Sequence, residues 1–128
     1  MKLPILYCCL AVAAFALLSS CYRDVVSPGA DPNGPPQQVS FSGDVLPILN
    51  SKCATSGCHD GVPSHKPALT AEKAYGSLVN GGYVNLMLPS QSSIYLVIKG
   101  GSMPPTGPLK SSDVQKVYDW IRTGAANN

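Results

Sequence analysis

The chain has 128 residues and a formal net charge of +2 at pH 7, with 45% hydrophobic and 12% charged residues. No basic run or stripe stands out in this nearly balanced charge pattern, which excludes the electrostatic signature of a nucleic-acid-binding protein. The sequence contains no internal repeat, so it is expected to form one small domain with terminal extensions.

Residues 1–20 have the layout of a secretory signal peptide. A lysine at position 2 is followed by a mostly apolar stretch at 3–18 and then by two serines. The apolar stretch is shorter than the ~20 residues of a membrane-spanning helix, and Pro4 lies inside it. We therefore predict that this segment directs export and is then removed.

Cys21 follows the signal segment directly. Leu18-Ser-Ser-Cys21 resembles the lipobox of bacterial lipoproteins, in which the cysteine is acylated and becomes the mature N-terminus. We expect a lipid anchor at Cys21 that holds the exported protein on a membrane, on the periplasmic side or at the cell surface. Tyr22 in place of aspartate favours the outer membrane. An uncleaved anchor helix is the alternative.

Residues 21–40 are predicted to connect the anchor to the domain. They contain four prolines and two glycines and show little apolar periodicity. This composition is typical of a disordered linker of mixed coil and polyproline character. Residues 41–128 then remain as a single domain, which is small for a stable core without a covalent staple.

The domain is expected to begin with a helix from Gly43 to about Lys52. Ser42 can cap this helix, and Asp44 lies in its first turn, where a carboxylate complements the helix dipole. The apolar face is formed by four residues, Val45, Leu46, Ile48 and Leu49.

The run Cys53-Ala-Thr-Ser-Gly-Cys58-His59 is the most informative motif of the chain. Two thiols can add to the two vinyl groups of a haem, and a histidine directly after the second thiol is placed to bind the iron. The common bacterial motif has two residues between the cysteines, whereas this one has four. If Cys8 and Cys9 leave with the signal segment and Cys21 carries lipid, only Cys53 and Cys58 remain for such a role.

Two other chemistries fit the same motif. In an oxidising compartment, Cys53 and Cys58 would tend to form a disulfide, although a disulfide does not require the adjoining His59. A zinc site needs four ligands, and these three residues together with His65 supply four.

A second helix is expected over Ala71–Val79. Thr70 can cap it, and Gly81 or Gly82 can end it.

A third helix is expected over residues 94–98, where Ser92 or Ser93 can start it and Gly100 can stop it. The run is also rich in residues that favour β-structure, so a strand is the alternative there.

The last helix has the clearest pattern, ending at Gly124. Ser111 or Ser112 can cap it, and Asp113 lies in its first turn. Apolar residues recur at i, i+3, i+4 and i+7, namely Val114, Val117, Tyr118 and Ile121. The sequence therefore predicts an all-α domain.

Three further segments occur in a characteristic order. They are Phe41-Ser-Gly-Asp44-Val-Leu-Pro47-Ile-Leu, then Met103-Pro-Pro after a glycine-rich turn, then Trp120-Ile-Arg-Thr-Gly124-Ala. With the cysteine motif they resemble small class I-like c-type cytochromes, most of all the monohaem domains of planctomycete and Bacteroidetes proteins. The resemblance covers about residues 41–126. It implies about four short helices around one covalently bound haem c, with the first and last helices crossing.

The resemblance also implies that His59 and Met103 are the axial ligands of the iron. A thioether favours ferrous iron and raises the reduction potential. Met87, in the apolar run at 84–88, is expected to pack in the core. His65 is a rival sixth ligand, but it lies only six residues after His59, so that reaching the opposite face of the ring would be awkward.

Several other residues have less certain assignments. A carbonyl of Pro67 or Pro63 is expected to accept the second N–H of His59. Trp120 and Tyr95 either contact the haem or pack as core aromatics. The carboxylates form no pair suited to general acid–base catalysis, and cap or surface roles explain most of them: Asp44, Asp60, Glu72, Asp113 and Asp119.

The expected function is electron transfer by a membrane-tethered monohaem cytochrome c that passes single electrons between redox proteins, and not enzymatic catalysis. A haem enzyme or gas-binding module with an open sixth position is one alternative, although no distal histidine or arginine can be identified for it. A surface interaction domain without haem is another.

Overall fold

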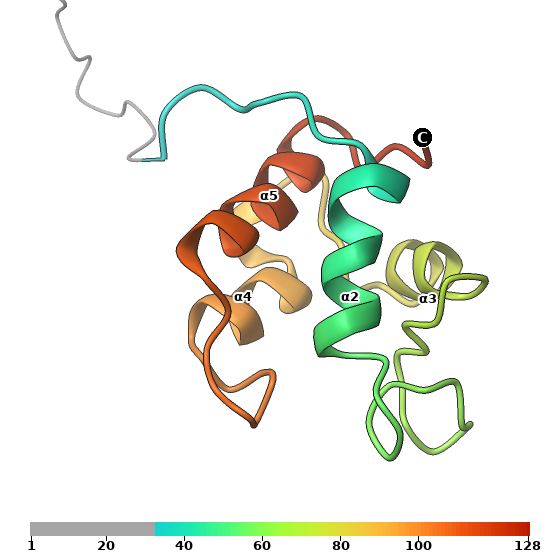
Figure 1. Cartoon of the computed structure of the whole chain (residues 1–128). Helices are drawn as coiled ribbons and strands as arrows, with labels where there is room; N and C mark the ends of the chain where they lie inside the picture. Colours follow the sequence, from blue (N-terminus) through green and yellow to red (C-terminus); the bar gives the residue numbers. More distant parts are fainter. Residues whose placement is uncertain (1–32) are drawn as a thin grey trace, which may run out of the picture. The chain divides into compact units, whose positions relative to one another are not determined.

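The computed structural model describes residues 33–128. Within this range the chain forms four α-helices, a π-helical turn and a 3-10 turn, and no strand (Figure 1). The elements are η1 (Phe41–Val45), α2 (Leu46–Lys52), α3 (Ala74–Asn80), η2 (Pro89–Gln91), α4 (Ser93–Lys99) and α5 (Ser111–Arg122). The predicted all-α class is confirmed. The signal segment, Cys21 and the first part of the predicted linker lie outside the described residues.

The first helical segment begins earlier than predicted. Ser40, and not Ser42, is its N-cap, because the Ser40 hydroxyl accepts a hydrogen bond from the Gly43 N–H at 3.1 Å. The Ser42 N–H instead donates to the carbonyl of Asn128 at 2.8 Å. A π-helical turn leads directly into α2, and Pro47 is the second residue of α2.

Helix α3 begins at Ala74, three residues after its predicted start. The Thr70 carbonyl accepts bonds from the N–H groups of Lys73 and Ala74, at 3.0 and 2.8 Å, so the intervening residues form a turn. The helix ends at Gly81 as expected, and Gly82 follows with φ of 76°, a conformation that glycine adopts without strain.

Helix α4 forms where the sequence also allowed a strand, so the strand alternative is wrong. Its buried residues, Ile94, Tyr95 and Ile98, recur with helical spacing. Leu96 and Val97 lie on the exposed side, with 47% and 38% of their surfaces accessible. Helix α4 ends at Gly100, also as expected.

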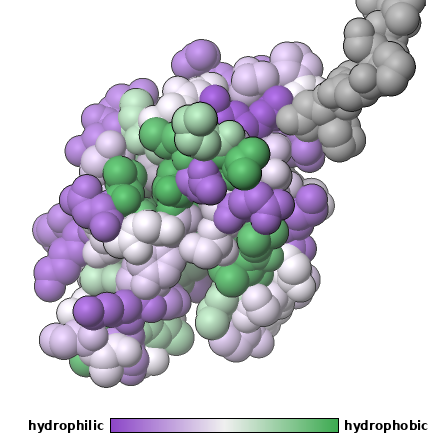
Figure 2. All heavy atoms as spheres, turned by 180° about the vertical axis from the view of Figure 1, so that it is seen from behind, coloured by the Kyte–Doolittle hydropathy of each residue, from purple (hydrophilic) through white to green (hydrophobic). Residues whose placement is uncertain are grey.

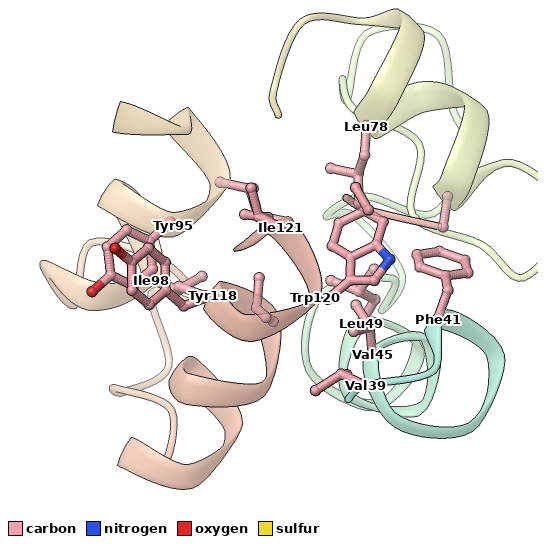
Figure 3. Close-up of a cluster of buried hydrophobic side chains, with 14 of the residues drawn as sticks. Val39, Phe41, Val45, Leu49, Leu78, Tyr95, Ile98, Tyr118, Trp120 and Ile121 are labelled. Atoms are coloured by element: carbon pink, nitrogen blue, oxygen red, sulfur yellow. The ribbon is translucent and has the colours of Figure 1, made fainter. Parts of the chain in front are cut away.

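Helix α5 supplies the centre of the core. Trp120 is completely buried, and its indole N–H donates to the Ala126 carbonyl at 2.9 Å. Its ring centroid lies 5.2 Å from that of Phe41 (Figure 3). The centroid of the Tyr75 ring lies 6.4 Å away. On the other side of α5, Tyr118 stacks on Tyr95 with ring centroids 4.2 Å apart. The N-terminal residue of α5 is Ser111, but its cap is Lys110 and not a serine.

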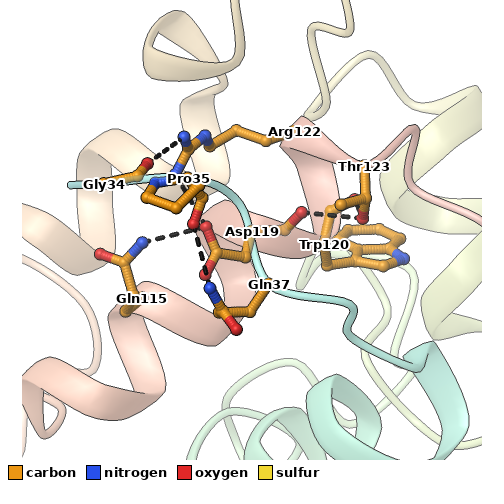
Figure 4. A network of polar contacts seen from close by, with 8 residues as sticks. All are labelled: Gly34, Pro35, Gln37, Gln115, Asp119, Trp120, Arg122 and Thr123. Atoms are coloured by element: carbon orange, nitrogen blue, oxygen red, sulfur yellow. Dashed lines mark hydrogen bonds and ion pairs between the residues drawn. The ribbon is translucent and has the colours of Figure 1, made fainter. Parts of the chain in front are cut away.

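A polar network on α5 holds part of the predicted linker against the domain. Asp119 is 2% exposed and accepts bonds from Gln115 at 3.0 Å and Arg122 at 2.9 Å (Figure 4). Arg122 also donates to the Gly34 carbonyl. Asp119 is therefore a buried partner of an arginine, so the cap and surface roles expected for most of the carboxylates do not apply to it. Within residues 33–40, Val39 lies in the core of the domain, whereas residues 35–38 are exposed.

No helix among residues 33–128 has both the length and the hydrophobicity needed to cross a bilayer.

Candidate haem site

A cavity of about 450 Å³ opens between the cysteine motif and α4. This volume lies in the usual range of pockets that hold small molecules and cofactors. The residues that surround it are Leu49, Lys52, Cys53, Gly57, Cys58, His59, His65, Lys66, Pro67, Leu69, Leu78, Tyr83, Ser93, Ile94, Val97, Ile98, Met103, Pro104 and Pro105. All four predicted haem residues of the domain thus line one cavity, although Met103 lies 50 positions from Cys53 in the sequence.

The two cysteines differ in their surroundings. Cys53 caps the C-terminus of α2 and is only 7% exposed, whereas Cys58 is exposed. Burial, followed by the nearby Cys58, raises the pKa of the Cys53 thiol. Both cysteines are free, so the disulfide alternative is not formed in this structure.

The four residues between the cysteines form a compact loop. The Cys58 N–H donates to the Thr55 carbonyl at 2.9 Å, and the His59 N–H donates to the Cys53 carbonyl at 3.0 Å. The second bond closes the loop on itself. It brings the backbone of His59 back to the end of α2 despite the longer spacing.

The His59 imidazole makes one hydrogen bond, to the carbonyl oxygen of Pro67. Its Nδ1 lies 2.8 Å from the Pro67 carbonyl oxygen. Because a carbonyl oxygen can only accept, Nδ1 carries the proton, and Nε2 of the neutral ring keeps its lone pair. Pro67 rather than Pro63 is therefore the partner, one of the two that the sequence offered. A second bond, from the Leu69 N–H to the His59 carbonyl at 2.9 Å, closes the loop that carries Pro67.

Met103 lies in the loop after α4. The N–H groups of Ser102 and Met103 both donate to the Val97 carbonyl, at 3.1 and 3.2 Å, so that the end of α4 fixes the start of this loop. Met103 is 39% exposed and lines the cavity. Its thioether is therefore available to a bound group rather than used up in packing.

The expectation that Met87 packs in the core is wrong. Its side chain is 89% exposed. The Asn85 side chain accepts bonds from the N–H groups of Met87 and Leu88, at 3.0 and 2.9 Å, and this turn directs the apolar run outward. Leu86 and Leu88 are exposed as well, at 54% and 59%. Figure 2 shows that hydrophobic side chains gather in patches on the face of the molecule opposite to the view of Figure 1.

His65 also lines the cavity, but its imidazole is placed by Asp60. The His65 Nδ1 lies 3.4 Å from Asp60 Oδ1. Among residues 33–128, no three His, Cys, Asp or Glu side chains form a group that could hold a metal ion, so the four zinc ligands are not assembled. Backbone N–H bonds from Gly57 and Val62 hold the pKa of the Asp60 carboxyl below its usual value.

The sequence left open which aromatic residues line the site and which pack in the core. Trp120 and Tyr95 do not line the cavity and belong to the core, whereas Tyr83 lines it. Tyr83 was missed because it follows a glycine pair outside any helix and carries no periodic signal. Asp60 was missed as a loop organiser, although the dipeptide Asp60-Gly61 is a known turn signal.

The cavity combines soft and neutral donors with apolar walls. An imidazole nitrogen, a thioether sulfur and two thiols meet buried side chains such as Leu69, Leu78 and Ile98. The charged residues in its lining are basic, Lys52 and Lys66, and its lining contains no Asp or Glu. No protein-family model, curated protein or solved structure matches this chain.

Proposed function

We propose that the protein is a membrane-tethered monohaem cytochrome c that carries single electrons between redox proteins. Cys53 and Cys58 attach one haem c, and His59 and Met103 bind its iron. The fold in this proposal is a small class I cytochrome c-like domain. The observation that supports it best is the convergence of these four residues on one apolar cavity.

The donor chemistry of the cavity fits a haem. The Pro67 carbonyl holds the proton on Nδ1 of His59, which leaves Nε2 as a neutral nitrogen donor. Met103 supplies a thioether from the loop after α4. Nitrogen and thioether sulfur together are the ligand pair that raises the reduction potential of cytochromes c.

The two thiols account for permanent attachment. Each thiol would add its S–H across the C=C bond of a vinyl group, with an S–C bond formed and the hydrogen placed on the neighbouring carbon. Nothing leaves, and no oxidant is consumed.

The remaining residues of the cavity set the environment of the iron. The bound haem would supply one-electron chemistry, and the chain controls it through ligands, burial and hydrogen bonding. Leu69, Leu78 and Ile98 keep water away from the ligands. Lys52 and Lys66 offer positive charge to the acidic groups of a bound ligand.

Binding of an external ligand separates an electron carrier from a haem enzyme. With Met103 on the iron, the ferrous protein should bind carbon monoxide slowly and incompletely, because the sulfur must leave first. The ferric protein should show a weak far-red absorption band and little peroxidase activity. Immediate, complete binding of carbon monoxide to the wild-type protein would favour the alternative with an open sixth position.

The membrane tether is tested independently of the haem. Two or three acyl chains on Cys21 hold a protein on a bilayer far more firmly than one chain. Cys21→Ala should accumulate as a precursor that keeps its signal segment. Residues 22–128 behind an ordinary cleavable signal should instead give a soluble haem protein. A Cys21→Ala protein that still matures and still carries lipid contradicts the proposed anchor.

A further inference from the structure

The two cysteines of the proposed haem site are held by different parts of the chain. Cys53 is fixed by α2, since its N–H donates to the Leu49 carbonyl at 2.8 Å. Cys58 lies outside any helix and is exposed. The position of its thiol therefore depends on how well the loop between the cysteines is held.

Asp60 directly follows His59 in the sequence, and its carboxylate accepts a hydrogen bond from the loop between the cysteines. Its Oδ2 accepts the Gly57 N–H at 2.9 Å. Its Oδ1 accepts the Val62 N–H at 3.3 Å and lies 3.4 Å from His65 Nδ1. One side chain thus ties the residue before Cys58 to residues after His59, on both sides of the two groups that must meet a haem.

The conformation of Gly57 shows why the loop needs such a tie. Its φ is 80°, a left-handed conformation that glycine adopts readily, but not by preference over the others open to it. Fixing the backbone of a residue in one conformation costs conformational entropy, and the cost is highest for glycine. Without a bond to its N–H, Gly57 would be free to populate other conformations and to move Cys58 away from its position.

We propose that Asp60 is a positioning residue that holds Cys58 and His59 in register with Cys53 across the four-residue gap. The inference rests on the proposed haem attachment. Asp60 acts through the Gly57 N–H and does not itself contact the bound group. Its loss should weaken attachment through Cys58 while leaving attachment through Cys53, which α2 fixes.

Asp44 provides a matched control for variants of Asp60. Its carboxylate also accepts a backbone N–H bond, from Ser40 at 3.1 Å, and pairs with a basic side chain, Lys116, at 3.1 Å. Neither Asp44 nor its partners line the cavity. Substitution of Asp44 therefore removes a similar set of bonds without touching the loop.

The test uses the full chain expressed with a cytochrome c maturation system. Wild type, Asp60→Ala, Asp60→Asn and Asp44→Ala are denatured, their free thiols are alkylated, and mass spectrometry counts the thioether bonds at each cysteine. Asp60→Ala should give at least ten times more protein with Cys53 linked and Cys58 alkylated than Asp44→Ala gives. Asp60→Asn should be intermediate, because an amide keeps one accepting oxygen of two. Equal distributions in all four proteins overturn the proposal.

Amide hydrogen exchange at Gly57 separates this inference from the proposed function. If the wild-type protein carries no haem, the proposed function is wrong, and exchange is then compared between haem-free wild type and Asp60→Asn. Faster exchange at Gly57 in Asp60→Asn, with unchanged exchange in α5, supports the loop role of Asp60. Equal exchange at Gly57 contradicts it. If Asp60→Ala does not accumulate, exchange at Gly57 in wild type and in Asp60→Asn still tests the loop role of Asp60.

Discussion

The core around Trp120 and the cavity around Cys53 use apolar side chains in different ways. In the core, the rings of Phe41, Tyr75 and Trp120 pack on one another, and the indole N–H has its own carbonyl partner. In the cavity, equally buried side chains such as Leu78 and Ile98 surround about 450 Å³ that the chain does not fill. The difference teaches that apolar side chains in one part of this domain fill the interior, while those in another part leave a cavity, which the proposed function assigns to a haem.

The largest expected effect comes from the core. Trp120→Ala should lower the free energy of unfolding by about 3–5 kcal/mol, because it removes the largest fully buried side chain and leaves a cavity. Urea denaturation followed by circular dichroism measures the change.

The same variant sharpens the comparison if it still folds. Its far-red band and its carbon monoxide binding should match those of the wild type, since Trp120 does not line the cavity. A changed iron spectrum in folded Trp120→Ala protein would mean that core and cavity are coupled.

The next effect comes from the cavity, with Met103→Ala and Met87→Ala as a matched pair. Met103→Ala should abolish the far-red band, lower the reduction potential and open the iron to carbon monoxide, because a ligand that stabilises ferrous iron is lost. Met87→Ala should keep the band and change stability by less than about 0.5 kcal/mol, as expected for an exposed side chain. Optical spectra and redox titration of both variants measure these outcomes.

The result that breaks this assignment is equally specific. If Met103→Ala keeps the spectrum and potential of the wild type, the sixth ligand is Met87, His65 or solvent. Solvent in that position would favour the haem enzyme over the electron carrier.

A smaller effect is expected on the pH dependence of stability, through the ion pair of Asp44, which lies away from the cavity. The hydrogen bond from Lys116, followed by that from the Ser40 N–H, lowers the pKa of Asp44 below 3.8. A lowered pKa in the folded state contributes stability above the unfolded pKa, and this contribution is lost as the pH falls through the folded pKa.

In Asp44→Asn, the free energy of unfolding should therefore fall less steeply than in the wild type as the pH drops from just above 4. Lys116→Met should have the same effect, since it removes the first cause of the shift. Urea midpoints measured between pH 7 and pH 3 provide the test. Curves parallel to that of the wild type would show that the ion pair carries no pH-dependent stability.

Local signals in the sequence predicted much of the fold. The apolar spacing of α5 and the glycines after α3 and α4 were sufficient to place these helices. Helix starts were predicted less well, because several serines and threonines compete as caps, and the choice of Ser40 depends on contacts with residues such as Asn128, far along the chain.

The site was predictable where a motif carries its chemistry in adjacent residues. Cys53, Cys58 and His59 are close in sequence, and Pro67 follows within a short loop. The prediction that Met87 packs in the core was wrong, because an apolar run gives no sign of the turn at Asn85 that exposes its side chain. The burial of Asp119 could not be predicted, because it goes with hydrogen bonds from Gln115 and Arg122 that a helical pattern alone does not show.

Mass spectrometry of the mature wild-type protein tests the central claim most directly. After expression with a cytochrome c maturation system and extraction with acid and acetone, the protein should keep the mass of one haem. Proteolysis should then place it on the peptide that contains Cys53 and Cys58, with neither thiol open to alkylation. A fully extractable haem, or a protein without haem whose two thiols are both alkylated, would contradict the account.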